Sequence, residues 1–493
     1  MKEHEVAIIG AGLGGLCAAI QLQKAGVTDY VVLERDSEVG GTWRDNTYPG
    51  CACDVPSHLY SYSFAPKLDW TRPYPSQPEI QAYILELVKR YGLRAHVQLH
   101  SAMTGARWDA AEKRWHIDVN GHPALRARFL IAATGPLNKV SIPELPGRDV
   151  FAGAQFHSSQ WRHDVALAGQ RVAVIGTGAS AIQIVPELAK TAARVDVFQR
   201  TPSWLVPRPN RAYSALQRWA FAHVPGLQRA NRWRIYWLNE WITRSYLGAR
   251  SVRGLVRWLA LAHLKRQVLS PVLRAQLTPA YEPGCKRIGV SNDFYPALQQ
   301  PHVHLVTEGI ERLEPDAVVT RDGVRHPCDA IVWCTGFKVT EFVDPALKLV
   351  GENGTELGNL WRTQPAQSYL GISVAGFPNM FLVVGPNTGL GSNSIIFMIE
   401  CQVRYIVQAI THMQQECYKN NSFLRIQYAG QKAFYMQVQH KTQHTVWASG
   451  CTSYYQSADG RLDTLWPGFT TSYWWRTRRF APQAYEPLQS RSS

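Results

Sequence analysis

Two glycine-rich turns carry the clearest chemical signal in this sequence. The first has Gly10, Gly12 and Gly15 in a G-x-G-x-x-G pattern, after the apolar segment VAIIG and before LCAAIQL. This order predicts a strand, a tight turn and a helix, which bring backbone N–H groups and the positive end of the helix dipole to a diphosphate. The next apolar segment, YVVLE, ends at Glu34, whose carboxylate can bind the hydroxyls of an adenosine ribose. The first turn therefore predicts a dinucleotide site.

The same pattern returns in the segment RVAVIGTGASAIQ, which contains Gly176, Gly178, Ser180 and, in the third motif position, Ala181. The following apolar segment, VDVFQR, ends at Arg200, as far from Gly176 as Glu34 is from Gly10. A cation at this position pairs with the 2′-phosphate of NADP, which a carboxylate would repel. The second turn therefore predicts NADPH, and the first predicts FAD.

Two further apolar segments, FLIAATG at 129–135 and DAIVWCTGF at 329–337, end in Thr-Gly and flank the second turn. They indicate where the chain passes between two dinucleotide domains. We expect an α/β fold with two nested Rossmann-like domains and an all-helical insertion. The predicted limits are 1–142 and 331–493 for the FAD-binding domain and its C-terminal closing segment, 143–203 and 284–330 for the NADPH-binding domain, and 204–283 for the insertion.

The composition limits the classes of protein that remain. The chain has 493 residues, 45% of them hydrophobic, and a formal net charge of +15. No nucleic-acid-binding signature accompanies this charge, so we expect no nucleic-acid partner, and no metal-ligand spacing predicts a metal site. The nine scattered cysteines predict thiols rather than disulfides, and the absence of a signal peptide or a long apolar run predicts a cytoplasmic protein.

Much of the positive charge lies between residues 200 and 290, where Trp, Leu and Ile alternate with Arg at helical spacing. Two interpretations of this segment remain open. One is an insertion with a solvated basic face, and the other is peripheral contact with an anionic membrane or with lipophilic substrate held there.

At residues 151–161 the sequence FAGAQFHSSQW fits the fingerprint F-x-G-x-x-x-H-x-x-x-W, with its anchors at Phe151, Gly153, His157 and Trp161. With the two turns, it makes nearly the whole chain resemble the class B flavin monooxygenases, and among them the Baeyer-Villiger monooxygenases. Related heteroatom oxidisers usually have Tyr or Phe where Trp161 stands. Arg162 departs from the Pro or Asp that often follows the fingerprint, and the four anchors remain intact. The resemblance implies that this segment links domains and responds to NADPH.

The resemblance also implies roles for residues that their own spacing does not assign. In GGTWRDNTYPGCACDVP, residues Gly41, Thr42 and Trp43 would lie near the flavin, and Asp54 would be the acid near its reactive face. In GCKRIGVSNDFY, Lys286 would join Arg200 and Thr201 at the 2′-phosphate, and Arg287 would be the catalytic arginine. For the aromatic residues of the C-terminal segment, pocket contact and simple packing remain equally open; these are Trp447, Tyr454 and Tyr455.

What the resemblance implies is an NADPH-dependent flavin monooxygenase that oxidises a small lipophilic ketone with O2, through a C4a-peroxyflavin, to an ester or lactone. The alternative is a flavin monooxygenase that oxidises nitrogen or sulfur of a lipophilic substrate. A disulfide reductase would need a CxxC pair where this chain has Cys51 and Cys53, and a sensor without oxygen chemistry would lack Asp54 or Arg287. The identity of the ketone, the regiochemistry and the oligomeric state stay open.

Overall fold

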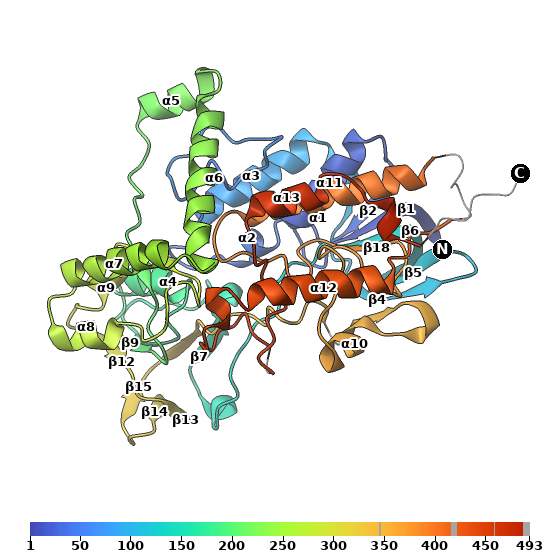
Figure 1. Ribbon diagram of the computed structural model, residues 1–493. Coiled ribbons are helices and arrows are strands. Elements are labelled where there is room, and N and C mark those ends of the chain that lie inside the picture. The colour runs from blue at the N-terminus through green and yellow to red at the C-terminus, as the bar shows by residue number, and fades with distance from the viewer. Residues whose placement is uncertain (345–346, 416–421, 458, 487–493) are drawn as a thin grey trace, which may run out of the picture.

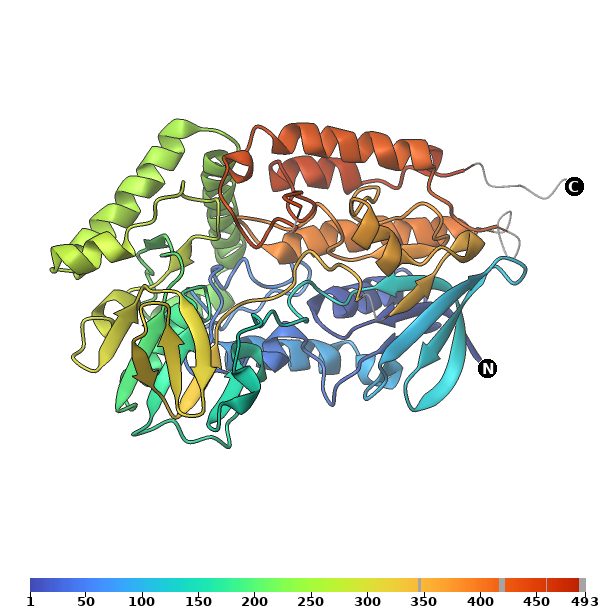
Figure 2. The same cartoon turned by 90° about the horizontal axis from the view of Figure 1, so that it is seen from below.

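A computed structural model describes residues 1–344, 347–415, 422–457 and 459–486. The chain forms two large sheets that lie side by side, each covered by helices, and a group of helices projects at the end near the second sheet (Figure 1). The same two-part arrangement is visible from below (Figure 2). This architecture confirms the predicted α/β class with two Rossmann-like units.

The first sheet has the strand order β17-β4-β5-β6-β1-β2-β3, and β18 also pairs with β6. Strands β1, β2, β3 and β6 are parallel, so the chain ends of β1, β2 and β6 meet at one edge, where the first glycine turn lies. Helices α1 (Leu13–Lys24) and α11 (Ile395–Met413) pack against each other over this sheet. The strands are β1 (Lys2–Ile9), β2 (Tyr30–Leu33), β3 (Val97–Gln98), β4 (Met103–Asp109), β5 (Arg114–Val119), β6 (His122–Ala132), β17 (Lys348–Val350) and β18 (Met380–Leu382).

The second sheet has the order β12-β9-β8-β16-β7, and all its strands are parallel. Strand β16 belongs to this sheet, so the domain limit that we predicted after residue 330 cuts through a strand. The reason is that β16 pairs with both β8 and β7 along its whole length. The strands are β7 (Ala154–His157), β8 (Arg171–Ile175), β9 (Arg194–Phe198), β12 (Val303–Val306) and β16 (Ala330–Trp333), and an antiparallel unit of β13 (Ile310–Glu314), β14 (Ala317–Thr320) and β15 (Arg325–Pro327) follows β12.

The two passages between the sheets run next to each other. Ser141 donates its backbone N–H to the carbonyl of Gly336 at 2.9 Å, and Lys338 donates to the carbonyl of Lys139 at the same distance. An isolated bridge between Val140 and Phe337 lies between these bonds. The chain a few residues after FLIAATG is thus paired with the end of DAIVWCTGF, so the two passages form one narrow connection.

The helical insertion begins and ends at two short paired strands, β10 (Leu205–Val206) and β11 (Gly289–Val290). Between them lie α5 (Ala215–His223), α6 (Leu227–Tyr246), α7 (Arg250–Gln267) and α8 (Pro271–Leu277). The predicted range 204–283 is therefore helical apart from β10 and its loops. Figure 1 shows α6 running from the remote helix α5 down to the region between the two sheets.

The remaining helices complete the cover of the two sheets. They are α2 (Thr42–Asp45), α3 (Gln77–Arg90), α4 (Ala181–Leu188), α9 (Phe294–Ala297), α10 (Leu357–Thr363), α12 (Tyr428–Thr442) and α13 (Thr470–Thr477), with short 3-10 turns at 93–96, 148–150, 158–160, 352–354, 446–448 and 482–484. Within the described ranges, every helix is too short or too polar to traverse a lipid bilayer.

The glycines of the two turns are required by the backbone. Gly10 has φ +98° and Gly176 has φ +109°, a region that disfavours any residue with a Cβ. A Cβ on Gly15 would lie 1.9 Å from the Gly10 carbonyl oxygen, and one on Gly176 would lie 2.4 Å from that of Cys334. A Cβ on Gly178, in contrast, would meet no atom within 4 Å. The turns therefore hold their helices close to the sheets, while Gly178 leaves its backbone open.

We predict that Gly176→Ala destabilises the fold by about 1 to 3 kcal/mol, because the new Cβ forces the turn out of its conformation. Thermal unfolding should show a clearly lower Tm for this variant. Gly178→Ala is the matched control and should unfold close to wild type. Equal Tm values for Gly176→Ala and wild type would contradict the backbone argument.

Candidate active site

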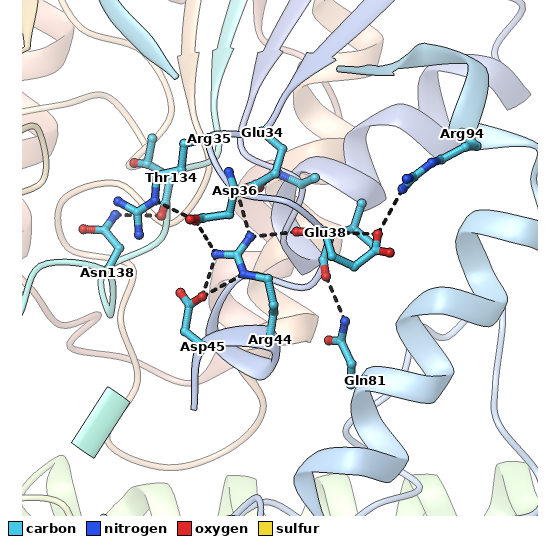
Figure 3. Close-up of polar contacts among 12 residues, drawn as sticks. Glu34, Arg35, Asp36, Glu38, Arg44, Asp45, Gln81, Arg94, Thr134 and Asn138 are labelled. Atoms are coloured by element: carbon cyan, nitrogen blue, oxygen red, sulfur yellow. Dashed lines mark hydrogen bonds and ion pairs between the residues drawn. The ribbon is translucent and has the colours of Figure 1, made fainter. Parts of the chain in front are cut away.

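The first turn and the end of β2 form a polar site with an acidic residue at its centre. The Glu34 carboxylate is 5% exposed and accepts the backbone N–H of Ala11, within the turn, at 2.8 Å. Arg44 donates to the same carboxylate at 2.9 Å and to Asp36 and Asp45 at 2.6 Å each (Figure 3). The arrangement can present one carboxylate to a ribose while Arg44 holds it in place. Sequence reasoning missed Arg44, although it directly follows the predicted Trp43.

The segment that carries Gly41 closes over this turn. A Cβ on Gly41 would lie 3.2 Å from the Cα of Gly12, so only glycines allow the two backbones to approach so closely. Gly12 is the N-cap of α1 and makes no side-chain capping bond, which leaves the N–H groups of the first helical turn open to a ligand. Thr42 begins α2, and the Trp43 indole N–H donates to the Tyr60 hydroxyl at 3.0 Å. The backbone cradle fits a diphosphate.

The second turn is next to a group of cations. Lys286 donates its Nζ to the Thr201 hydroxyl at 3.0 Å, and burial together with the charge of Arg200 lowers the pKa of Lys286. Within the part of the chain that the structure describes, no carboxylate forms an ion pair with Arg200 or Lys286. Ser180, at the N-cap of α4, makes no side-chain capping bond. Two cations without a counterion, beside an open helix N-terminus, suit a ligand with several phosphates.

Arg287, the neighbour of Lys286, reaches the other half of the molecule. Its guanidinium makes a bidentate ion pair with Asp54, with Nη2 at 2.7 Å from Oδ1 and Nε donating to Oδ2. Burial raises the pKa of Asp54, but the charge and hydrogen bonds of Arg287 outweigh it and lower that pKa below its usual range. The Asp54 charge holds the pKa of Arg287 well above its ordinary value. Both groups therefore stay ionised at any working pH.

Aromatic residues of the C-terminal segment surround this ion pair. Trp447 is 3% exposed and donates its indole N–H to the carbonyl of Gly284 at 3.0 Å, so it packs against the loop that carries Arg287. Tyr454, which is 47% exposed, donates to the hydroxyl of Tyr455 at 2.8 Å, and burial raises the pKa of the Tyr455 phenol. Trp447 also lines a small pocket with Tyr246. Trp447 therefore both packs against the loop that carries Arg287 and lines the small pocket.

The fingerprint residues lie at the passage between the sheets. Phe151 is in the core of the second unit, and a Cβ on Gly153 would lie 2.2 Å from the carbonyl oxygen of Asp329. His157 ends β7 and packs edge-on against Phe337, with ring centroids 5.2 Å apart. Burial lowers the pKa of His157 to about 4, so this imidazole is neutral at physiological pH. Trp161 packs against Phe156 at 5.1 Å. These contacts fit a linking role and do not place His157 as an acid or base.

A disulfide links the Arg287 loop to the C-terminal segment, which corrects the expectation that all cysteines are thiols. Cys285 and Cys451 are bonded, with their Cα atoms 6.4 Å apart and a separation of 166 positions in sequence. Sequence reasoning could not find the pair because nothing in the spacing of two distant cysteines indicates proximity. Cys51 and Cys53 are both buried free thiols.

The fold and this site define an oxidoreductase with two dinucleotide sites facing one ion pair. A family described as pyridine nucleotide-disulphide oxidoreductase matches residues 7–232. A Baeyer-Villiger monooxygenase of Streptomyces coelicolor is 42% identical over 99% of this chain and 95% of its own length, and one of Pseudomonas aeruginosa is 41% identical over 98% and 91%. A closed crystal structure of cyclohexanone monooxygenase covers 100% of both chains with a TM-score of 0.88 and 26% identity.

The chain belongs to the Baeyer-Villiger monooxygenase family. It is therefore a flavin monooxygenase that uses FAD and NADPH, as the two turns predicted. The disulfide-oxidoreductase match, over residues 7–232, covers both glycine turns, and this chain has no CxxC motif.

We predict that Arg200→Ala raises the KM for NADPH about 10- to 150-fold and leaves that for NADH nearly unchanged, because a charge-assisted contact contributes about 1.5 to 3 kcal/mol. Steady-state kinetics with both nucleotides measures this. The exposed Arg312→Ala is the control and should change neither value. An equal rise in the KM for NADPH and for NADH would show that Arg200 does not bind the 2′-phosphate.

We also predict that dithiothreitol lowers the Tm of the wild type, since loss of a crosslink costs about 2 to 4 kcal/mol. Cys451→Ser should start at the lower Tm and be insensitive to the reductant. Mass spectrometry after alkylation of untreated protein gives an independent check. Labelling of both Cys285 and Cys451 there would contradict the disulfide.

Proposed function

We propose that this enzyme inserts one oxygen atom of O2 beside the carbonyl of a lipophilic ketone, giving an ester or lactone, with NADPH as reductant. The observation that carries the proposal is the dipeptide Lys286–Arg287. Its first residue contacts Thr201 of the second unit, and its second residue binds Asp54 of the flavin-side segment. Two adjacent cations on one short loop, one at each cofactor site, suit an enzyme whose nucleotide stays beside the flavin during oxygen transfer.

The residues divide between the two cofactors. FAD would be held by the first turn and the segment that closes over it, through Gly10, Gly12, Gly15, Glu34, Gly41, Thr42 and Trp43. NADPH would be held by the second turn and the cation group, through Gly176, Gly178, Ser180, Arg200, Thr201 and Lys286. When bound, these groups supply hydride transfer and the activation of O2. The close backbone approach of Gly12 and Gly41 supports the first assignment, and the uncompensated cations support the second.

Arg287 is proposed as the catalytic residue that stabilises negative charge during oxygen transfer. Arginine suits this task because it remains protonated and does not give up its proton to an anion. A unit negative charge about 4 Å from a cation gains about 4 kcal/mol at an effective dielectric of 20, which is close to a thousandfold in rate. Asp54 orients the guanidinium through its Nε and Nη2 atoms, which leaves Nη1 outside the bidentate pair.

The surroundings of Arg287 shield it from water in part. The Arg287 side chain is 30% exposed and that of Asp54 is 25% exposed, while Tyr246 and Trp447 are 3% and Tyr455 is 5% exposed. Partial removal of water strengthens the charge on Arg287 and would help to keep protons from an anionic species. The passage at His157 and Phe337 would let the two units shift as nucleotide binds, which is the role that we propose for the fingerprint.

The proposed substrate is a small lipophilic ketone, and the proposed compartment is the cytoplasm. Such ketones partition into membranes, so peripheral membrane contact through the basic helical insertion is part of this proposal. The small pocket that Tyr246 and Trp447 line also contains Thr243, Ser392 and Trp466, a mostly aromatic and hydroxyl lining that suits a neutral carbonyl compound.

We predict that Arg287→Ala still binds FAD and still oxidises NADPH, but releases hydrogen peroxide and forms no ester. The reason is that the charge that protects the oxygen-transfer step is lost while both turns remain intact. NADPH consumption, peroxide and product mass would be measured together on a panel of ketones and sulfides. Arg287→Lys keeps a point charge but loses the bidentate pair, so its ester yield should lie between those of the wild type and of Arg287→Ala.

Ester formation by Arg287→Ala at near the wild-type rate would overturn the role of Arg287. If the wild type oxidised only the sulfides of the panel, the heteroatom-oxidising alternative would replace the ketone proposal.

A further inference from the structure

The helical insertion exposes apolar side chains to a degree found nowhere else in the described residues. Of the 23 large hydrophobic residues that are exposed there, 14 lie between residues 216 and 272. Five are tryptophans with 41 to 63% of their surface exposed. We name this set the tryptophan face; it consists of Trp219 on α5, Trp233, Trp237 and Trp241 on α6, and Trp258 on α7.

The arrangement of α6 shows that this exposure is a feature of one face. Ile235, Tyr236 and Glu240 point to the protein and are buried. Trp233, Trp237 and Trp241 follow one another at intervals of four residues and are 41 to 56% exposed. The first two rings stack at 6.4 Å and contact Tyr236 edge-on, at 5.6 and 5.5 Å. The tryptophans therefore form a largely exposed stripe along the helix.

The charge of the insertion is strongly positive. Between residues 204 and 283 the sequence has thirteen Arg and Lys and two acidic residues, Glu240 and Glu282. Glu240 is 3% exposed and accepts hydrogen bonds from Thr470 and Asn393 in the interior. The outer surfaces of the four helices thus carry no carboxylate. A solvated helix face normally carries both positive and negative side chains, so this surface suits an anionic neighbour.

One part of this surface is shaped for anionic groups. Arg250, Arg253 and Arg257 lie on the same side of α7 and line a groove with Gly254 and Glu282. Glu282 is 3.5 Å from Arg257 and 4.0 Å from Arg253, so one carboxylate faces three guanidinium groups. Trp258 and Leu255, both exposed, are next to these arginines on the helix. Cations beside exposed Trp and Leu match the layer of phosphates over acyl chains at a membrane surface.

We propose that the outer face of α5, α6 and α7 docks on an anionic phospholipid membrane, with the tryptophan face in the interfacial layer and the arginines on lipid phosphates. A second copy of this chain does not fit, because it would bring two strongly basic helical surfaces against each other. Nucleic acid does not explain the exposed Leu and the stacked Trp stripe. The proposal specifies the membrane contact of the proposed function and does not depend on the ketone chemistry.

The position of α6 relates the proposed membrane surface to the small pocket. Its exposed stripe begins near α5, and its last turn ends at Tyr246, which lines the small pocket with Trp447 (Figure 1). Thr243, one turn before Tyr246, contacts Ser392 in the same pocket at 2.7 Å. One helix thus runs from the proposed membrane surface to residues that line this pocket.

The test is co-sedimentation of the FAD-loaded enzyme with vesicles of phosphatidylcholine alone or mixed with phosphatidylglycerol. The wild type should bind the mixed vesicles at least tenfold better than phosphatidylcholine vesicles at low salt. It should be released by 0.5 M NaCl, because the Debye length falls to about 4 Å at that salt concentration. Trp233→Ala/Trp237→Ala/Trp241→Ala should lower binding at least tenfold. Trp475→Ala, a tryptophan 58% exposed on α13, is the matched control and should bind like wild type.

Two further measurements make each outcome decisive. Brominated lipid should quench wild-type tryptophan fluorescence and quench the triple variant much less, and flavin absorbance shows that the variant is folded. NADPH oxidation without vesicles should be unchanged in the triple variant, so a failed ketone assay and a failed docking assay remain distinct. Absence of wild-type binding to anionic vesicles at low salt would overturn the proposal. The proposal would also be overturned if mutation of the tryptophan face only dissociated a dimer or only abolished DNA binding.

Discussion

The ion pair between Arg287 and Asp54 is the interaction on which the site depends. The two charges come from different parts of the chain, one from the loop after the helical insertion and one from the segment that follows the first glycine turn. Taking both out of water is costly, and their bidentate geometry and mutual shift in pKa offset that cost. An ion pair of this kind orients its two side chains more than it stabilises the fold. It sets where the guanidinium points when the cofactors are bound.

Several contacts keep the loop of Arg287 in register with both cofactor sites. The disulfide at Cys285 and the Trp447 bond to Gly284 anchor it to the C-terminal segment, and Lys286 anchors it to Thr201. The strands β10 and β11 pair at the stem of the insertion, immediately beyond this loop. Because the anchors come from three different regions, a movement of the second unit on NADPH binding would be transmitted directly to Arg287.

The sequence predicted the parts of this structure that are local. Each glycine turn, with its strand, helix and ribose-side residue, lies within about thirty residues, and the backbone requirements at Gly10 and Gly176 follow from the turn itself. The partners of those turns are not local. Arg44 beside Glu34, the Cys285–Cys451 bond and the pairing of 139–141 with 336–338 depend on how distant segments meet, which spacing does not reveal. The resemblance placed Asp54 and Arg287 together, and elementary spacing alone would have left each as a surface charge.

In the proposed function, the exposed face of the insertion and the ion pair of Arg287 with Asp54 address two parts of one chemical problem. A lipophilic ketone is scarce in water, while the oxygen-transfer step requires that water be kept out. In our proposal, an outer helix face rich in Trp and Arg would concentrate such a substrate at a lipid surface, and α6 runs from that face toward Tyr246 and Trp447. The basic charge would then have two distinct uses in one chain. On the insertion it is spread over a surface and screened by salt, and at Arg287 it is single, 30% exposed and fixed by one carboxylate, so only the latter can discriminate between charge states of a reacting group.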